Sequence, residues 1–219
     1  NLSIAQISEA ADVSKATVVR FCKSLDFNGL KDFKVWYEAG KGARYTEVVP
    51  VREDDNAERI STGLSSGIMR SLERTLGKES YPVLETFVED IVSASSIIVR
   101  GEGEAESYSA LLRESIEKFY PEKKIIWNPQ GEEEADLCLA VSITGKEKLT
   151  MDSISRVVFA GGKADVISAN PQSLISKAAT NAIQVSDELF FKGDEHILGK
   201  FAILAGIEIL TVHMGKDKV

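Results

Sequence analysis

The chain has 219 residues, of which 43% are hydrophobic and 27% are charged, and this composition is that of an ordinary globular protein. No apolar run approaches the roughly 20 residues that a membrane span needs, since the richest segment, 201–214, is interrupted by Glu208. The two cysteines, Cys22 and Cys138, lie in apolar segments and indicate buried thiols in a reducing compartment, not a disulfide framework. We therefore expect a cytoplasmic protein that does not bind a membrane.

The net charge of −8 is unevenly distributed along the chain. Residues 1–45 contain seven basic and five acidic side chains, a balance of +2, which leaves −10 for the remainder. Such an asymmetry indicates a small domain that binds a polyanion, attached to a larger domain that does not. The chain begins at Asn1, without Met and already in patterned sequence, so we expect that an N-terminal part of the protein precedes it.

Two short helices are predicted at the start of the chain. Ser3 and Gln6 have the spacing of a capping box, and Ser14 can cap a second helix that runs to Leu25. Four apolar residues of this second helix have helical spacing and are expected to face inward: Val18, Phe21, Cys22 and Leu25.

Two short helices joined by a tight turn form a helix-turn-helix, whose second helix lies in the DNA major groove. Lys15 or Arg20 could contact guanine, whereas the side chains of Ser14, Thr17 and Lys23 suit phosphate. The expected DNA-binding residues are Ser14, Lys15, Ala16, Thr17, Arg20 and Lys23. The alternative is an amphipathic helical hairpin with a solvated polar face.

The segment 10–34 resembles the DNA-binding module of the RpiR family of bacterial transcription regulators. The matching residues are Val13, Ser14, Ala16, Thr17, Val18, Arg20, Phe21, Leu25, Phe27, Gly29, Asp32, Phe33 and Lys34. Asp12 and Asp26 stand where this family often has glycine. The resemblance implies an operator-binding module that is truncated at its start, because family members carry one or two further helices before this pair.

Three parts are expected: the helix-turn-helix module at 1–45, a polar linker at 46–55 and a second domain at 56–219. In the second domain, apolar runs with strand character alternate with helical patterns, which predicts an α/β fold with a five-stranded parallel sheet covered on both faces. The expected strands are 96–99, 124–127, 137–142, 164–169 and 182–185, and the expected helices are 56–78, 82–94, 105–119, 147–160, 172–179 and 195–214. Ligands of such sheets bind beyond the carboxyl ends of the strands.

This second domain resembles a sugar isomerase (SIS) domain, in an α/β/α arrangement that implies phosphosugar binding and dimerisation. The family's first loop, G-x-G-x-S, corresponds to 101–105, with Ala105 in place of the serine. Its second loop, I-S-x-S-G-x-T, corresponds to 141–147, with Glu147 in place of the threonine. In this resemblance, Lys200 corresponds to a basic residue usual in the final helix. The ligand-binding residues implied are Gly101, Gly103, Ser142, Thr144, Gly145, Lys146, Ser168 and Ser173.

The chemistry of the second loop fits a phosphate, because hydroxyls, backbone N–H groups and Lys146 can converge on a dianion. An ordinary capped strand-to-helix turn is the alternative. The first loop, GEGEAES at 101–107, carries three glutamates that would repel a phosphate, so we expect it to have a lesser role.

The sequence thus predicts a transcriptional regulator that binds operator DNA as a homodimer or a dimer of dimers and senses a phosphorylated sugar. One alternative is a regulator whose second domain only dimerises. Another is a sugar-phosphate isomerase, which needs a general base; the candidates are Glu102, Glu104, Glu195 and His196. We expect no enzymatic activity and no cofactor. We also expect no metal site, because two histidines and two distant cysteines give no metal motif.

Overall fold

The computed structural model describes residues 3–11, 13–24, 28–31, 33–34, 50–188, 190–192, 196–216 and 218. The chain divides into two units, residues 1–46 and residues 47–219. Several residues singled out in the sequence lie outside the described ones: Asp12, Leu25, Asp26, Phe27, Asp32, Glu195 and the first part of the expected linker, residues 46–49.

The first unit contains the helices α1 (Ile4–Ala10) and α2 (Lys15–Ser24), which pack against each other. The capping box at the start of α1 is confirmed: the Ser3 N–H donates to Gln6 Oε1 over 2.7 Å, and the Gln6 N–H donates to Ser3 Oγ over 3.3 Å. In α2, Val18 and Cys22 are buried as expected.

The expectation that Phe21 faces inward is wrong. Its side chain is 55% exposed, and it meets the ring of Phe33 edge-on, with 6.1 Å between the ring centroids. Helical spacing places Phe21 beside Val18 and Cys22, but two short helices cover only a narrow strip of α2. The exposed part of the ring lies beyond that strip.

The second unit is built on a five-stranded, fully parallel sheet with the strand order β2-β1-β3-β4-β5. The strands are β1 (Ser96–Gly101), β2 (Lys124–Trp127), β3 (Leu137–Ser142), β4 (Lys163–Ser168) and β5 (Asn181–Gln184). The predicted sheet is confirmed, with β4 and β5 each beginning one residue earlier than expected. After β2 the chain crosses β1 to form β3, so the order reverses between β1 and β3, and ligands of doubly wound folds bind at this switch point.

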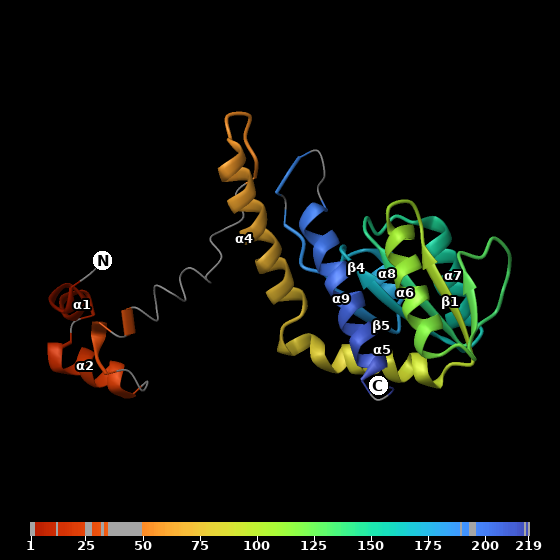
Figure 1. The fold of residues 1–219 in the computed structure, drawn as a ribbon, viewed down its shortest axis with the longest axis horizontal. Helices are drawn as coiled ribbons and strands as arrows, with labels where there is room; N and C mark the ends of the chain where they lie inside the picture. Colours follow the sequence, from red (N-terminus) through yellow and green to blue (C-terminus); the bar gives the residue numbers. More distant parts are fainter. Residues whose placement is uncertain are drawn as a thin grey trace. The chain divides into compact units, whose positions relative to one another are not determined.

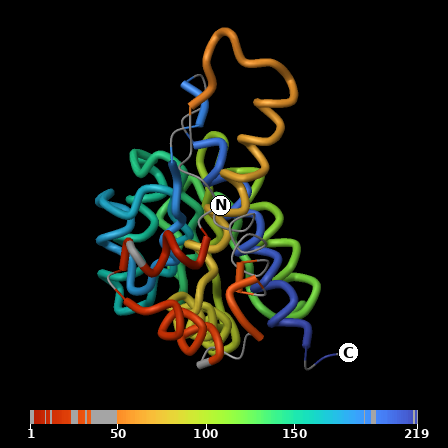
Figure 2. The backbone as a smooth tube through the Cα atoms, turned by 90° about the vertical axis from the view of Figure 1, so that its left-hand side faces the viewer, coloured from red at the N-terminus to blue at the C-terminus, as the bar shows by residue number. Residues whose placement is uncertain are grey.

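Helices cover both faces of the sheet, as the α/β/α prediction requires (Figures 1 and 2). The helices described in this unit are α4 (Ala57–Thr75), the short 3₁₀ helix η1 (Lys78–Ser80), α5 (Tyr81–Ser93), α6 (Ala105–Phe119), α7 (Lys148–Phe159), α8 (Leu174–Ala178) and α9 (Ile197–Gly215), and α4 packs against α9. Figure 2 shows α7 and α8 gathered on one side, with α6 and α9 on the other.

The side chains of alternate residues in the buried strands pack into two separate hydrophobic cores. Ile97 and Val99 of β1 join the larger core under α5, α6 and α9, whereas Ile98 joins the smaller core under α7 and α8. β3 divides in the same way, with Leu139 in the larger core and Cys138 in the smaller one. A strand buried on both faces reads as a continuous apolar run, which is why the sequence located β1 and β3 so closely.

Among the described residues, α9 is the one helix whose length and apolar composition would allow it to cross a membrane, which corrects the expectation that no apolar run approaches that length. In the structure α9 packs against α4, α5 and α6, and residues such as Ile203 and Ile207 are fully buried (Figure 1). Its composition is therefore that of a core helix.

Candidate functional site

The first candidate surface is the amino end of α2. The Thr17 N–H donates to Ser14 Oγ over 3.1 Å, and the two hydroxyls lie 2.9 Å apart, so Ser14 caps the helix. Five of the six predicted DNA-binding residues are exposed, and Thr17 is half-buried: the exposed ones are Ser14, Lys15, Ala16, Arg20 and Lys23. The predicted residues are thus accessible to a partner, and three of them are basic.

The second candidate site lies at the switch point of the sheet, where β1 and β3 end side by side with Gly101 opposite Val141. The loop after β1, residues 101–107, and the loop after β3, residues 142–148, meet here. Together they line a small hollow of about 270 Å³ with Glu102, Gly103, Glu104, Ala105, Ile143, Thr144, Lys146 and Glu147. Three of the predicted ligand residues therefore line it: Gly103, Thr144 and Lys146.

The centre of the β3–α7 loop, residues 142–148, is the buried carboxylate of Glu147. Its Oε1 accepts from the Thr144 N–H at 2.8 Å, from Thr144 Oγ1 at 3.0 Å and from the Ile143 N–H at 3.1 Å. Its Oε2 accepts from Ser142 Oγ at 2.8 Å. The predicted phosphate donors of this loop thus converge on one point, but a side chain of the same loop occupies that point.

The electrostatic state of Glu147 follows from these bonds. Burial alone would raise the pKa of Glu147, but the donors from Thr144, Ser142 and its own backbone N–H outweigh burial and hold the pKa below its usual range. At neutral pH the loop therefore contains a carboxylate anion at the amino end of α7, where the helix dipole also favours negative charge.

The glutamates of the loop after β1 are also engaged. Glu102 Oε2 accepts from the Leu149 N–H at 2.9 Å, and this N–H belongs to the first turn of α7. Glu104 Oε2 lies 2.7 Å from Lys200 Nζ of α9. The two carboxylates therefore take up an N–H and a cation that an anionic ligand would otherwise use.

Backbone geometry at Gly145 brings in a third loop. Gly145 has φ +75°, and a Cβ placed on it would lie 2.3 Å from the Cβ of Ser173. Asn170 Nδ2 donates to the Thr144 carbonyl over 3.0 Å, so the loop after β4 is tied to the β3–α7 loop. This close approach requires glycine.

The other predicted ligand residues lie at the same edge of the sheet but do not line the hollow. Gly101 is buried, and its N–H donates to Asn128 Oδ1 over 2.9 Å. Ser168 is buried and its Oγ accepts from the Asn170 N–H, while Ser173 caps α8 by accepting from the Ser176 N–H at 3.1 Å. Their hydroxyls shape the loop after β4.

Of the candidate bases, His196 lies directly before α9. Its Nδ1 lies 2.7 Å from Asp187 Oδ2, and Asp187 Oδ1 accepts from the Gly199 N–H at 3.0 Å. This arrangement joins the segment after β5 to the first turn of α9: Asp187 accepts from the helix N–H, and His196 lies beside that carboxylate.

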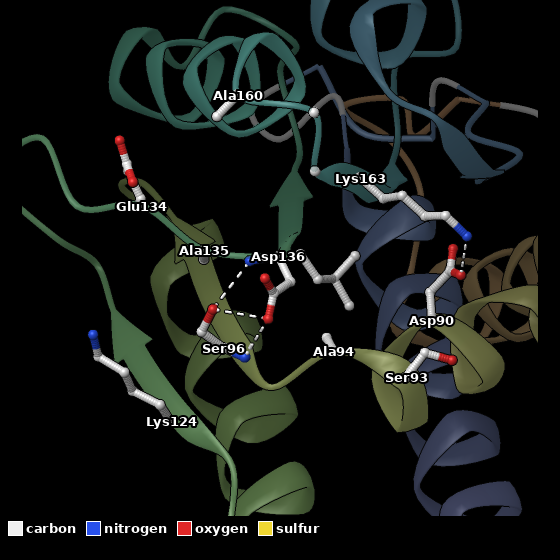
Figure 3. A pocket seen from close by; sticks show the side chains of 13 residues that line it. Asp90, Ser93, Ala94, Ser96, Lys124, Glu134, Ala135, Asp136, Ala160 and Lys163 are labelled. Atoms are coloured by element: carbon white, nitrogen blue, oxygen red, sulfur yellow. Dashed lines mark hydrogen bonds and ion pairs between the residues drawn. The ribbon is translucent and has the colours of Figure 1, made fainter.

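A larger hollow of about 660 Å³ lies at the opposite edge of the sheet, where the strands begin (Figure 3). Asp136 there accepts from the backbone N–H groups of Ser95 and Ser96, each over 2.9 Å, and these bonds hold its pKa below the usual range. Lys163 Nζ lies 2.5 Å from Asp90 Oδ1. Because these polar groups pair with each other and the edge is the wrong one for a doubly wound fold, the smaller hollow is the better site.

A buried carboxylate lies next to this larger hollow. Asp165 of β4 is fully buried, and its Oδ1 accepts from Asn181 Nδ2 over 2.8 Å. Asn181 Nδ2 also lies 3.2 Å from Asp90 Oδ2. Burial raises the pKa of Asp165 to about 7, although the bond from Asn181 acts in the opposite direction.

No group of three or more histidine, cysteine, aspartate or glutamate side chains that could hold a metal ion occurs among the described residues. Both cysteines are free and buried, and burial raises the pKa of Cys138 to about 12, which makes it an unreactive thiol.

Comparisons with known proteins agree with this geometry. Residues 1–39 match the model of the helix-turn-helix domain of the rpiR family. The HTH-type transcriptional regulator HexR of Escherichia coli is 31% identical over 120 residues, which are 54% of this chain and 40% of HexR.

Two solved structures have the same fold at low sequence identity. The NanR protein of Vibrio vulnificus, complexed with ManNAc-6P, has a TM-score of 0.61 at 18% identity, over 98% of this chain and 79% of NanR. The sugar isomerase domain of an RpiR transcription factor from Sphaerobacter thermophilus has a TM-score of 0.61 at 16% identity, over 72% of this chain and 90% of that domain.

A helix-turn-helix module followed by a sugar-isomerase-type parallel sheet defines a two-part transcriptional regulator. Residues 1–39 therefore carry a helix-turn-helix domain of the rpiR family, and the second unit shares the fold of the sugar isomerase domain of an RpiR transcription factor.

Proposed function

We propose that the chain binds a double-stranded DNA operator through the exposed face of α2 and acts as a cytoplasmic transcription regulator. The observation that carries this proposal is the exposure of Lys15, Arg20 and Lys23 along α2, whose amino end is capped by Ser14 and which is anchored by the buried Val18 and Cys22. A helix held in this way can present its first residues to base edges and its cations to phosphates.

The experiment is selection of genomic DNA fragments by the full chain, followed by fluorescence anisotropy on the enriched sequence. We expect a specific affinity at least a thousand times that for random DNA at physiological salt. Equal affinity for enriched and random fragments would refute the proposal.

For the second domain, we propose that it holds two copies of the chain together. α9 carries a strip of exposed apolar side chains beside its buried face, consisting of Phe201, Leu204, Ile209 and Val212 and interrupted by the exposed Glu208. Helix-turn-helix regulators bind two half-sites as dimers, and an apolar helix face is the kind of surface that a second copy covers. The assembly is then a homodimer or a dimer of dimers.

Sensing of a phosphorylated sugar is the alternative role of this domain, and the ManNAc-6P complex of the similar NanR protein supports it. The bonds of Glu147 to Ser142, Ile143 and Thr144 favour a domain that does not hold a phosphate at this loop. Among the described residues, the carboxylates at this edge are bound to loop donors or to Lys200, so they also offer no acid–base pair for an isomerase.

A further inference from the structure

We propose that Glu147 is a built-in occupant of the anion position of the β3–α7 loop, and that this single side chain excludes phosphate from the domain. The inference concerns ligand specificity of the second domain and goes beyond the proposed DNA binding, on which it does not depend.

The first argument is the set of donors. A phosphate at the end of β3 would need backbone N–H groups and hydroxyls that point to one position. This loop has such donors, the N–H groups of Ile143 and Thr144 and the hydroxyls of Ser142 and Thr144, and all four bond to the Glu147 carboxylate over 2.8 to 3.1 Å. A phosphate can bind them only if Glu147 leaves.

The second argument is that moving the Glu147 carboxylate out of the loop costs free energy. Glu147 is buried, and its lowered pKa shows that the charged form is stabilised where it lies. An internal carboxylate three residues from Thr144 also acts at an effective concentration that a ligand in solution, at millimolar levels or below, does not match.

The third argument is the charge of the surroundings. The loop after β1 brings Glu102 and Glu104 to the same hollow, and Glu104 neutralises Lys200. The hollow is lined by three carboxylates, those of Glu102, Glu104 and Glu147, and by one ammonium group, that of Lys146. A phosphate ester, which carries about −1.5 to −2 at pH 7, would enter a site that is already net negative.

The test replaces Glu147 by threonine, the residue that the SIS-domain pattern I-S-x-S-G-x-T has at this position. Inorganic phosphate and ManNAc-6P are titrated by calorimetry, at constant chloride and pH 7.5, into the full chain and its Glu147→Thr variant. We expect no heat of binding at 10 mM for the natural chain and a dissociation constant at least tenfold lower for the variant. Glu132→Thr, the same charge change in the exposed loop before β3, is the control and should not bind.

Two further variants separate this mechanism from a change in fold. Glu147→Ala should also bind phosphate, which covers the case in which Glu147→Thr does not fold. Adding Thr144→Val to Glu147→Thr should remove the binding gained, because one of the four donors is lost.

Binding of phosphate by the natural chain as tightly as by Glu147→Thr would overturn the inference, as would folded variants that bind no phosphate at all. DNA binding, measured on the same preparations, reports separately on the proposed function.

Discussion

The Glu102 carboxylate accepts a hydrogen bond from the backbone N–H of Leu149, and this bond ties the loop after β1 to the first turn of α7. The acidic loop 101–107 therefore has a structural explanation. Its glutamates satisfy an orphan N–H at one helix terminus and, through Glu104, pair with Lys200 of another helix. Of the residues that would repel a phosphate, Glu102 instead holds the two loops of the switch point together, and Glu104 holds the first loop to α9.

The DNA-binding face gives the first prediction. Lys15→Ala and Arg20→Ala should each weaken binding of the enriched operator by about 5- to 150-fold, the range expected when a contact to a base is lost, as measured by fluorescence anisotropy at moderate salt. Lys78→Ala, which removes one positive charge from η1 of the second unit, is the matched control and should change the affinity little. Unchanged affinity of both α2 variants would remove α2 as the reading helix.

The apolar strip of α9 gives the second prediction. Val212, which is 70% exposed, should lie in the contact between two copies, so Val212→Glu should bury an unpaired charge there and raise the dissociation constant of the dimer at least tenfold. Sedimentation equilibrium measures this constant. Ser107→Glu adds the same charge at an exposed position of α6 and should leave self-association unchanged. A dimer that tolerates Val212→Glu would place the interface elsewhere.

The buried carboxylate of β4 gives the third prediction. The pKa of Asp165 is about 7 in the folded chain and about 4 when unfolded, so between these values the folded state binds more protons than the unfolded state. The contribution of Asp165 to stability therefore falls as the pH rises from 4 to 7. We therefore expect the free energy of unfolding of Asp165→Asn, measured with denaturant, to rise relative to that of the natural chain between pH 4 and pH 7, by at most about 4 kcal/mol.

The neighbours of Asp165 decide how this comparison is made. Asn181 donates to Asp165, and Asp90 with its partner Lys163 lies on the other side of Asn181, so the pH dependence must be read as a difference between the two proteins. Asp152→Asn, an exposed change on α7, should run parallel to the natural chain. A constant difference between Asp165→Asn and the natural chain from pH 4 to pH 7 would show that folding does not raise the pKa of Asp165.

Gly145 gives the fourth prediction. Gly145→Ala should destabilise the domain by more than 2 kcal/mol, because alanine at φ +75° is strained by roughly 1 to 2 kcal/mol and its Cβ would also collide with Ser173. Gly103→Ala is a close control, since Gly103 has φ +62° but no atom within 4 Å of the new Cβ. Equal losses for the two variants in thermal unfolding would mean that the contact with Ser173 is relaxed without cost.

The sequence predicted the sheet well because each central strand is buried on both faces and so forms an unbroken apolar run. It also predicted the Ser3–Gln6 capping box, because such a motif joins residues only three positions apart. It was wrong for Phe21, since helical spacing identifies a face but not how much of that face a small module covers.

The site was predicted only in part. Spacing places Ser142, Thr144 and Gly145 at the switch point, but it indicates Glu147 only as the replacement of a threonine, whereas in the structure Glu147 occupies the loop. That role depends on the turn at Gly145, which folds the chain back so that residue 147 reaches the donors of residues 142–144. The pair between Glu104 and Lys200 joins residues 96 positions apart, and no local pattern could indicate it.

An occupant that belongs to the chain has a thermodynamic consequence. A ligand that binds the folded state from solution stabilises it by an amount that varies with ligand concentration. The Glu147 carboxylate is present at one fixed stoichiometry in every molecule, so its contribution to the order of the β3–α7 loop is the same in starved and in well-fed cells. If nothing displaces it, the number of chains in the cell, and not the level of a metabolite, sets the fraction of operator that is bound.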